Sequence, residues 1–353
     1  LVSLAQQPFP EWFANVIVSA RALETGVAPS PAASVISMLQ PYGGTLLLGS
    51  KHGALDLSAF THPELSAWSA PAGATSAYWR VSHRGALSGA GVWDHQFADV
   101  ENTACSADVH VSTNLVLQWF GRPGSEDVFD RHLMPMSPLF RNGLMFVSGK
   151  RNSLKAIDPY NGTRVWEITV PLSARIFQAM SGGFMCADDD FVYIVSSGSC
   201  WKVHGRTGAR TAVFNVPASG HHWGYIATQG GLVYGSWLVP QATLNAYFNP
   251  KVLLNQTVDS ARPLVSKGLF ALTNSSGAVQ WHYTTNSVII NQSIVIADEL
   301  ICFAESYSPP AVADPDNCVD LREFFATNAW IVALNASTGA ELWRRPLARL
   351  NPA

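Results

Sequence analysis

Six polar residues in the middle of the chain are candidates for chemistry, because they combine imidazole, carboxylate and guanidinium groups at loop or strand-start positions. They are His95, Asp130, Arg131, His132, His221 and His222. Imidazoles that converge on one point can bind a metal ion or transfer protons near neutral pH. Scattered histidines also hydrogen-bond backbone carbonyls, and Asp130 and Arg131 can form a simple ion pair. Both interpretations stay open, and the six residues are kept as a candidate loop site.

The elements that must position these residues follow a repeat. A small residue, a turn residue such as Asp or Asn, a glycine and an aromatic residue recur in that order; the four copies start at Ala156, Val203, Ala271 and Ala333 and run to Trp166, Phe214, Trp281 and Trp343. Glycine supplies the left-handed backbone of a tight turn, and the apolar runs on both sides predict strands. A second hairpin signal precedes each copy, as at Asn142-Gly143 and Asp188–Asp190. The pattern predicts four units of four strands over about residues 136–347.

Aromatic residues at one fixed place per unit predict packing between neighbouring units. Trp119, Trp166, Trp281 and Trp343 belong to this set. Two units carry insertions, around residues 237–266 and 305–327. Trp237, at the start of the first insertion, is the tryptophan most expected at the surface.

The whole pattern resembles the repeat of pyrroloquinoline-quinone-type β-propellers. The resemblance covers nearly all residues from about 86 onward, with Phe214 in place of tryptophan and His204-Gly205 as departures. Residues 91–106, 117–124 and 130–132 are similar to the lead-in of propellers that follow a methyltransferase-like domain. The resemblance to this repeat implies a mainly β fold in which residues 86–353 form a propeller of four-stranded blades. Four blades are fewer than most rings contain, so we expect either an open ring or further blades from additional sequence or from a partner chain.

Residues 1–85 lack the repeat pattern and instead alternate predicted strands with predicted helices. Strands are predicted at 13–19, near 45–49 and at 78–84, with helices at 31–39 and 57–70, which favours an α/β segment. The run Leu39-Gln-Pro-Tyr-Gly-Gly44 before a strand is similar to the C-terminal part of a class I methyltransferase. The glycine-rich turn for S-adenosylmethionine in that family has no counterpart here, so we expect a remnant without a methyl-donor site. An unrelated α/β cap is the alternative.

A quinoprotein dehydrogenase of this fold would need a calcium ion and often has adjacent cysteines beside its quinone. The chain has no adjacent cysteines, and Asp188–Asp190 has the composition of a hairpin tip rather than of a calcium site. We therefore expect neither pyrroloquinoline quinone nor calcium. No catalytic, cofactor-binding or metal-binding residue is assigned.

Composition limits the partners and the location. A net charge of −3 gives no basic surface for nucleic acid, and no apolar run approaches the roughly 18 residues that span a bilayer. Asn-x-Ser/Thr sequons predict glycosylation and a secreted, periplasmic or cell-surface location, although turns favour the same residues. The sequons start at Asn161, Asn255, Asn274, Asn291 and Asn335.

Five cysteines leave one unpaired in an oxidising compartment. Cys302 and Cys318 bracket an insertion rich in proline and aspartate, which makes them the best disulfide pair. Two buried, unbonded thiols are the alternative.

Together these observations favour a non-catalytic scaffold that presents loops for protein or ligand binding and assembly. The lipoprotein propeller of the outer-membrane assembly machinery, with similar repeats, is the analogy at the level of fold. Two alternatives stay open. One is a structural surface glycoprotein that completes its propeller with another chain, because an open ring leaves strand edges to pair. The other is a quinoprotein-like oxidoreductase.

Overall fold

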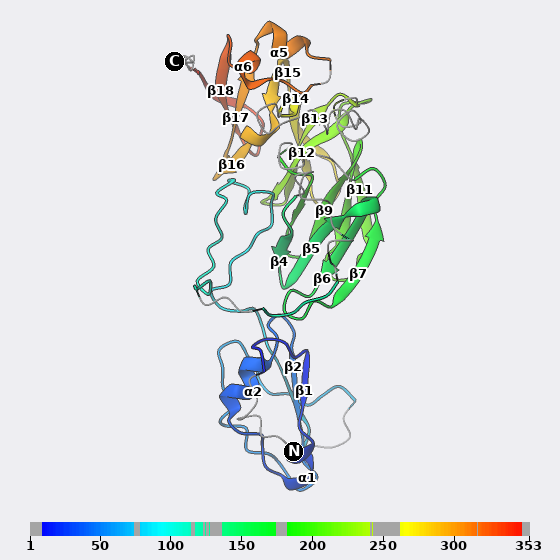
Figure 1. Ribbon diagram of the computed structural model, residues 1–353, viewed down its shortest axis with the longest axis vertical. Helices are drawn as coiled ribbons and strands as arrows, with labels where there is room; N and C mark the ends of the chain where they lie inside the picture. The colour runs from blue at the N-terminus through cyan, green and yellow to red at the C-terminus, as the bar shows by residue number, and fades with distance from the viewer. Residues whose placement is uncertain are drawn as a thin grey trace. The chain divides into compact units, whose positions relative to one another are not determined.

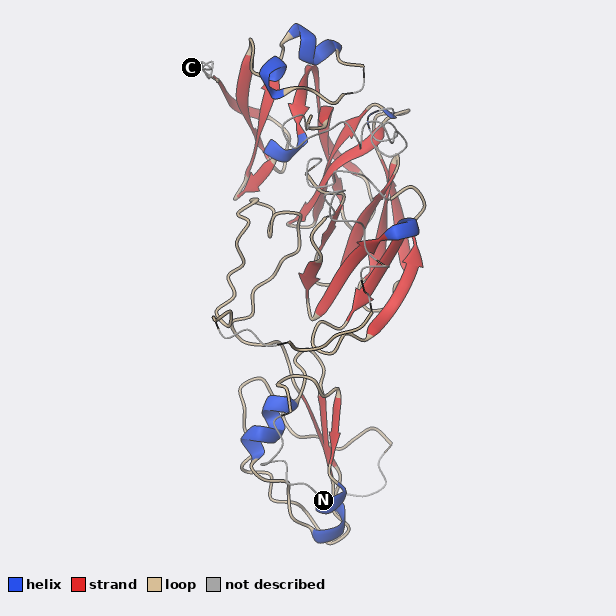
Figure 2. Ribbon diagram, viewed as in Figure 1, coloured by secondary structure: helices blue, strands red, loops and turns tan. Residues whose placement is uncertain are grey.

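The computed structural model describes residues 9–73, 78–113, 117–122, 124, 127, 136–173, 182–240, 242, 262–315 and 317–347. Backbone contacts divide the chain into two compact units. The first contains the N-terminal residues to Gly91, Ala107–Arg122 and the turn Asp158–Thr163; the second contains Val92–Ser106, Pro123–Ile157 and Arg164 onward. Figures 1 and 2 show the elements of each unit, which are treated separately here.

The first unit has a three-stranded sheet in the order β1-β2-β3, formed by Val16–Val18, Thr45–Leu48 and Arg80–His83. β1 runs parallel to β2, and β3 is antiparallel to β2. Two helices, α1 (Ala20–Thr25) and α2 (Ala32–Met38), lie between β1 and β2 in the chain. The side chains of α2 and β2 form the core with Leu39 and Phe60. The predicted alternation of strands and helices is thus present up to β2.

The helix predicted over residues 57–70 is wrong. This segment forms turns and then bridges to the third strand, with Leu65 opposite Arg84 and Ser69 opposite Val81. Pro63 has no backbone N–H and disfavours helical geometry in the residue before it, so a helix cannot run through this point. The amides of Ser66 and Ser69 instead donate to carbonyls of β3, at His83 and Val81.

The second unit contains the four predicted four-stranded blades. The first is β4–β7 (Leu139–Arg141, Leu144–Gly149, Ser153–Ile157, Arg164–Thr169), and the second is β8–β11 (Met185–Ala187, Phe191–Ser196, Ser199–His204, Arg210–Asn215). The third is β12 (His222–Gln229), β13 (Leu232–Leu238), β14 (Val265–Thr273) and the first half of β15 (Val279–Ile290). The fourth is β16–β19 (Val295–Ala297, Leu300–Ser306, Ala329–Asn335, Glu341–Pro346). Neighbouring strands within a blade are antiparallel, as in a propeller blade.

The third and fourth blades share a long strand. β15 pairs with β14 and then reaches β17, where Val288 lies opposite Ser306, so the two blades form one continuous sheet. Short helices fill the connections: η3 (Lys150–Asn152), η6 (Asn291–Ser293), and α5 (Pro309–Ala313) and α6 (Leu321–Phe324) in the second insertion. That insertion therefore lies between two strands, β17 and β18, as predicted.

The repeat turns have a common geometry. In each, the glycine has a φ between +69° and +75°, and its amide donates to the carbonyl four residues earlier. The residue that accepts this bond is Asp158, His204, Thr273 or Asn335. Asp158 and Asn335 also accept turn amides with their side chains, at 2.9 Å from Tyr160 and 2.9 Å from Thr338. The third turn is thus organised by Thr273, which takes the place that Asp158 and Asn335 have in the first and fourth turns.

The indole rings of Trp166 and Trp281 join successive repeats, which confirms the predicted role for these two residues, whereas Trp343 is 39% exposed. Trp166 lies against Gly208 of the second blade's turn and donates its Nε1–H to the Gly205 carbonyl at 2.7 Å. Trp281 lies against Gly339 of the fourth blade's turn and donates to the Ala336 carbonyl at 2.9 Å. A Cβ on either glycine would lie within 2.8 Å of a ring carbon, so the close approach requires glycine.

The same contact occurs within the first unit, where the indole of Trp119 lies against Gly162 and donates to the Pro159 carbonyl at 2.7 Å. The acceptor is always the residue after the one that organises the turn. We call this ring–glycine contact with its indole hydrogen bond the indole joint.

The joint between the second and third blades replaces the indole with two side chains. Phe214 lies two residues later than the tryptophan position, and a shift of two keeps it on the same face of the strand. Its ring covers Gly277, while the Lys202 ammonium donates to the Asn274 carbonyl at 2.7 Å. Phe214 therefore supplies the ring that covers the glycine, and Lys202 supplies the hydrogen-bond donor; tryptophan provides both in the other joints.

Trp237 is buried, so the expectation of an exposed Trp237 is wrong. It belongs to β13 rather than to the insertion, because that strand continues to Leu238. Its indole stacks on Phe270 with ring centroids 5.9 Å apart and covers Gly268. It is part of the core that the first three blades share.

Candidate functional site

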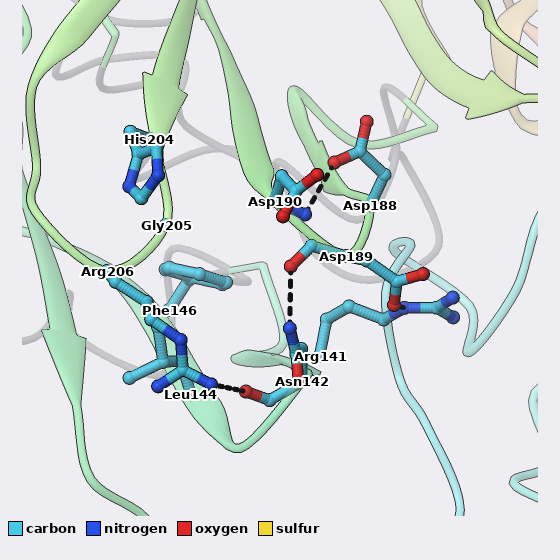
Figure 3. Close-up of a pocket in the computed structure, with 10 residues that line it drawn as sticks. All are labelled: Arg141, Asn142, Leu144, Phe146, Asp188, Asp189, Asp190, His204, Gly205 and Arg206. Carbon is cyan, nitrogen blue, oxygen red and sulfur yellow. Dashed lines mark hydrogen bonds and ion pairs between the residues drawn. The ribbon is translucent and has the colours of Figure 1, made fainter. Parts of the chain in front are cut away.

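A polar pocket lies at the hairpin tips of the first and second blades (Figure 3). Its walls are the turn after β4, the turn between β8 and β9, and the turn after β10; its ionisable side chains are Arg141, Asp188, Asp189, Asp190, His204 and Arg206. The pocket encloses about 110 Å³. At about 30 Å³ per water molecule, this is room for three or four waters and not for an organic cofactor.

Asp188 holds the β8–β9 tip together. Its Oδ1 accepts the amides of Asp190 at 3.0 Å and Phe191 at 2.8 Å, and its Oδ2 accepts the Tyr193 hydroxyl at 2.8 Å. Burial, aided by the Asp188 charge, raises the pKa of Tyr193 above its usual range, so this phenol stays a donor. Both oxygens of Asp188 are therefore occupied by protein donors, and the residues present here do not fit a calcium ion.

Arg141 fastens this tip to the segment before the first blade. Its Nε donates to Asp189 Oδ1 at 2.9 Å, and its Nη1 donates to Asp94 Oδ2 at 2.7 Å. Burial alone would lower the pKa of Arg141, but the two carboxylates outweigh burial and raise it. Asn142 adds a bond from its side-chain amide to the Asp189 carbonyl at 2.9 Å (Figure 3). The tip is thus held at several points.

His95 belongs to the same network and is 6% exposed. Its Nδ1 lies 2.6 Å from Asp94 Oδ1, and its Nε2 accepts the amide of Thr228 at 3.1 Å. An Nε2 that accepts an amide carries no proton, so the proton is on Nδ1 and points at Asp94. Both ring nitrogens are used within the fold, which gives His95 a structural role rather than one in proton transfer.

Among the predicted site residues that the structure describes, His221 and His222 do not join His95. His221 Nδ1 lies 3.2 Å from the Ser219 carbonyl, and His222 Nε2 lies 3.0 Å from Ser197 Oγ. His222 begins β12 and Thr228, the partner of His95, lies six residues further along it, a separation of roughly 20 Å at the rise of a strand. Asp130, Arg131 and His132 lie outside the described residues.

Three charged groups of the tip remain at the surface. The Asp189 side chain is 71% exposed, and Asp190 and Arg206 are exposed beside it. Over the described part of the chain, no three His, Cys, Asp or Glu side chains gather closely enough to hold a metal ion. The rim of the pocket therefore displays both signs of charge, and His204 lines it with a buried Nδ1 that has no hydrogen-bond partner in the described chain.

A larger hollow of about 480 Å³ lies in the first unit. Trp12, Ile36 and Leu87 supply apolar walls, and the buried pair Glu64 and Arg84 supplies the polar one. Arg84 Nε donates to Glu64 at 2.9 Å, and Glu64 also accepts the Ser88 amide at 2.8 Å. The sequence held no signal for this hollow, because its residues are scattered and share no motif.

The predicted sequons differ in their surroundings. Asn291 is fully buried, and its Oδ1 accepts the hydroxyls of Ser236 and Ser266, so the fold leaves no room for a glycan there. The Asn161 side-chain amide donates to Asn15 at 2.7 Å within the first unit. Asn274 and Asn335 lie on repeat turns and are partly exposed. Asn255 lies outside the described residues.

No disulfide links Cys302 and Cys318, so the bond predicted between them is not formed. Cys302 lies in β17 opposite Ala333, whereas the Cys318 thiol donates to the Arg262 carbonyl at 3.4 Å. The insertion between them is ordered by its own packing, in which Phe324 of α6 and Ala311 of α5 bury against Val288.

Comparison with known proteins identifies the family. Residues 57–351 match the family described as outer membrane protein assembly factor BamB. The chain belongs to the BamB family. The match begins inside the α/β segment, and the likeness of residues 1–85 to a methyltransferase stays a prediction. No curated protein matches the chain.

Two solved structures illustrate what this BamB-family chain is similar to. BamB from Moraxella catarrhalis is 13% identical, with a TM-score of 0.36 over 60% of this chain and 52% of that chain. Quinohemoprotein alcohol dehydrogenase from Comamonas testosteroni is 14% identical, with a TM-score of 0.47 over 72% of this chain and 41% of that one. The chain therefore spans about half, or less, of the length of these structures. No helix among the described residues is long and apolar enough to cross a membrane.

Proposed function

We propose that this chain is a non-catalytic β-propeller scaffold that binds protein partners through its hairpin tips. The observation that carries the proposal is the use of charge at the tip pocket. Asp188, Arg141, Asp94 and His95 hold the tip, while Asp189, Asp190 and Arg206 are exposed at its rim. Asp189 also pairs with Arg141, and Arg206 also donates to the Asn142 carbonyl at 3.3 Å. A rigid tip that displays both signs of charge suits recognition of a complementary charged surface.

Family membership supports this function. The family is described as an assembly factor for outer membrane proteins, a role that consists of binding other proteins. By the same reasoning we propose a location outside the cytoplasm, on the side that faces an outer membrane. The quinoprotein alternative gains no support from the tip pocket, because the pocket is too small for a quinone. Both oxygens of the Asp188 carboxylate also accept protein donors already.

Site-specific photo-cross-linking tests the proposal in the cells that produce the protein. A benzoylphenylalanine placed at Arg206 is expected to capture a discrete polypeptide, and one placed at the exposed Glu323 of α6 is the matched control. The charge reversal Asp190→Lys is expected to reduce the adduct at position 206 at least about fivefold, because it inverts one rim charge without touching the Arg141 pairs.

Two results would contradict the proposal. Adducts of equal yield at positions 206 and 323 would show that the tip has no special affinity. Dye-linked oxidation of an alcohol by the chain after incubation with pyrroloquinoline quinone and Ca²⁺ would show an enzyme instead.

A further inference from the structure

Only some of the charged side chains that line the tip pocket are paired. Arg141 pairs with Asp189, and both oxygens of Asp188 accept protein donors. The exposed Asp190 carboxylate, by contrast, has no hydrogen-bond or ion-pair partner among the described residues. Its backbone alone is bonded, through its amide to Asp188 and through its carbonyl to the Gly205 amide. The Asp190 side chain therefore leaves an uncompensated negative charge at the pocket.

His204 supplies a second unused group in the wall of the pocket. It lies next to Asp190, because the Gly205 amide that follows it donates to the Asp190 carbonyl at 2.7 Å. Its ring packs edge-on against Phe191, with centroids 5.7 Å apart, and its buried Nδ1 has no hydrogen-bond partner in the described chain. Buried polar atoms are nearly always hydrogen-bonded, so an imidazole left without a bond beside a pocket points to a group supplied from outside.

The balance of charge in the pocket favours a positive group. Three aspartates and two arginines line it, and one of those arginines, Arg141, also pairs with Asp94 outside the lining. The other, Arg206, is held to one side, because its Nη2 donates to the Asn142 carbonyl at 3.3 Å (Figure 3). Negative charge is thus in excess, and its unpaired part lies at Asp190. An acidic group would have to approach this carboxylate, whereas a basic group would neutralise it.

The size and walls of the pocket define the shape of that basic group. Leu144 and Phe146 lie in the lining and are buried, so part of the wall is apolar. The volume of about 110 Å³ holds three or four water-sized groups, which matches the last methylene groups and the ammonium of a lysine. The unused acceptors at Asp190 and His204 come from two different turns. An ammonium, whose three donors diverge, suits them better than the planar fork of a guanidinium.

We propose that the tip pocket receives a lysine side chain of the partner protein. The alkyl stem lies against Leu144 and Phe146, and the ammonium pairs with the Asp190 carboxylate beside the His204 imidazole. This inference rests on the proposed function as a protein-binding scaffold and names the side chain that the tip recognises. Asp190 is then the residue that selects the partner, while the paired residues around it keep the pocket open.

The test follows the His204 imidazole of the full chain by NMR, with short peptides as probes. The chain is labelled with ¹³C-histidine, and the His204 Cε1–Hε1 signal is assigned by its loss in His204→Gln. The main probe is an acetylated and amidated tripeptide with lysine between two glycines, which carries no other charge. Three matched probes have Nε-acetyllysine, arginine or glutamate in place of the lysine.

The lysine peptide is expected to shift the His204 signal and to saturate with a Kd of the order of 1 mM. The acetyllysine and glutamate peptides are expected to bind at least about tenfold more weakly, because the first lacks the charge and the second has the opposite one. Asp190→Asn is expected to weaken the lysine peptide by a similar factor, and it spares the contacts that hold the tip. Asp298→Asn, at the exposed hairpin tip between β16 and β17, is the matched control and should leave binding unchanged.

The proposal is overturned if the lysine peptide does not move the His204 signal at concentrations up to about 20 mM, or if the acetyllysine or glutamate peptide moves it equally. Tighter binding of the arginine peptide than of the lysine peptide would also overturn it, because the pocket would then fit a guanidinium. Each of these results leaves the photo-cross-links at Arg206 unaffected, since they need only a protein near the rim. Failure of the lysine proposal is therefore distinguishable from failure of the scaffold function.

Discussion

The Lys202 ammonium donates to the Asn274 carbonyl at 2.7 Å, at the point where the other joints place an indole N–H. The same ammonium lies 3.9 Å from the centre of the Phe191 ring, and Lys202 is only 8% exposed. A buried lysine thus compensates for the phenylalanine that replaces tryptophan at position 214. The compensation works because both solutions satisfy the same carbonyl with a donor from the preceding blade.

Lys202→Met is therefore expected to destabilise the second unit. The Asn274 carbonyl would lose its charged donor, a loss of about 1–3 kcal/mol in the free energy of unfolding by urea. Lys51→Met, at an exposed position, is the control and is expected to change it by less than about 0.5 kcal/mol. Phe214→Trp in the Lys202→Met background is expected to restore part of the loss, because the Asn274 carbonyl regains a donor from the indole N–H. Equal effects of the two lysine changes would refute this role for Lys202.

Gly339→Ala is expected to cost more than an ordinary turn substitution. The new Cβ would meet the Trp281 ring at 2.6 Å and would also force a side chain onto a φ of +69°. Strain and overpacking together are expected to lower the free energy of unfolding by about 2–4 kcal/mol. Gly230→Ala separates the two causes, since φ is +59° there and nothing lies within 4 Å of the added Cβ. A loss at Gly230 as large as that at Gly339 would show that the ring contact contributes nothing.

The sequence predicted the repeat because its signals are local. A glycine in a tight turn and an aromatic residue a few positions later lie within one hairpin, so strand, turn and ring position follow from a short stretch such as Asp158–Trp166. The same local reasoning failed at residues 57–70. The apolar residues there predicted a helix, but the backbone pairs with the distant segment around β3 instead. The prediction of an exposed Trp237 was wrong for a related reason. Trp237 lies within strand β13, and the insertion begins only after that strand ends at Leu238.

The candidate site was less predictable because its contacts are distant in sequence. Arg141 reaches Asp94 from 47 residues away, and Lys202 reaches Asn274 from 72 residues away. Neither residue stands in a motif, so neither was singled out. His95 was singled out as a candidate site residue, but both of its ring nitrogens bond to other parts of the fold. An imidazole in a loop can therefore have a purely structural role.

The cysteines are expected to divide sharply in reactivity. Cys105 is exposed, whereas Cys186 and Cys200 are fully buried, and burial raises the pKa of both buried thiols well above the ordinary value. With iodoacetamide at pH 8, Cys105 is expected to react at least about 100-fold faster than Cys186 or Cys200, which become reactive only in denaturant. Mass spectrometry of digested protein measures each site, and Cys105→Ser should remove the fast phase. Rapid native labelling of Cys200 would contradict this core packing.

Stability of the first unit is expected to fall in acid because of Glu64. Burial alone would raise the pKa of Glu64, but the Ser88 amide and the Arg84 guanidinium outweigh it and hold the pKa below the ordinary 4.5. A depressed carboxyl pKa gives stability that is present above the unfolded value and is lost as pH falls through the folded one. Thermal unfolding between pH 7 and 3, followed by hydrogen exchange of peptides from residues 9–91, should show this loss. Glu64→Gln should lower the midpoint of thermal unfolding at pH 7 and make that midpoint fall less steeply in acid. The exposed control Glu24→Gln should change neither. If the midpoint of Glu64→Gln fell with pH as steeply as in the wild type, the Glu64–Arg84 pair would be excluded as the cause.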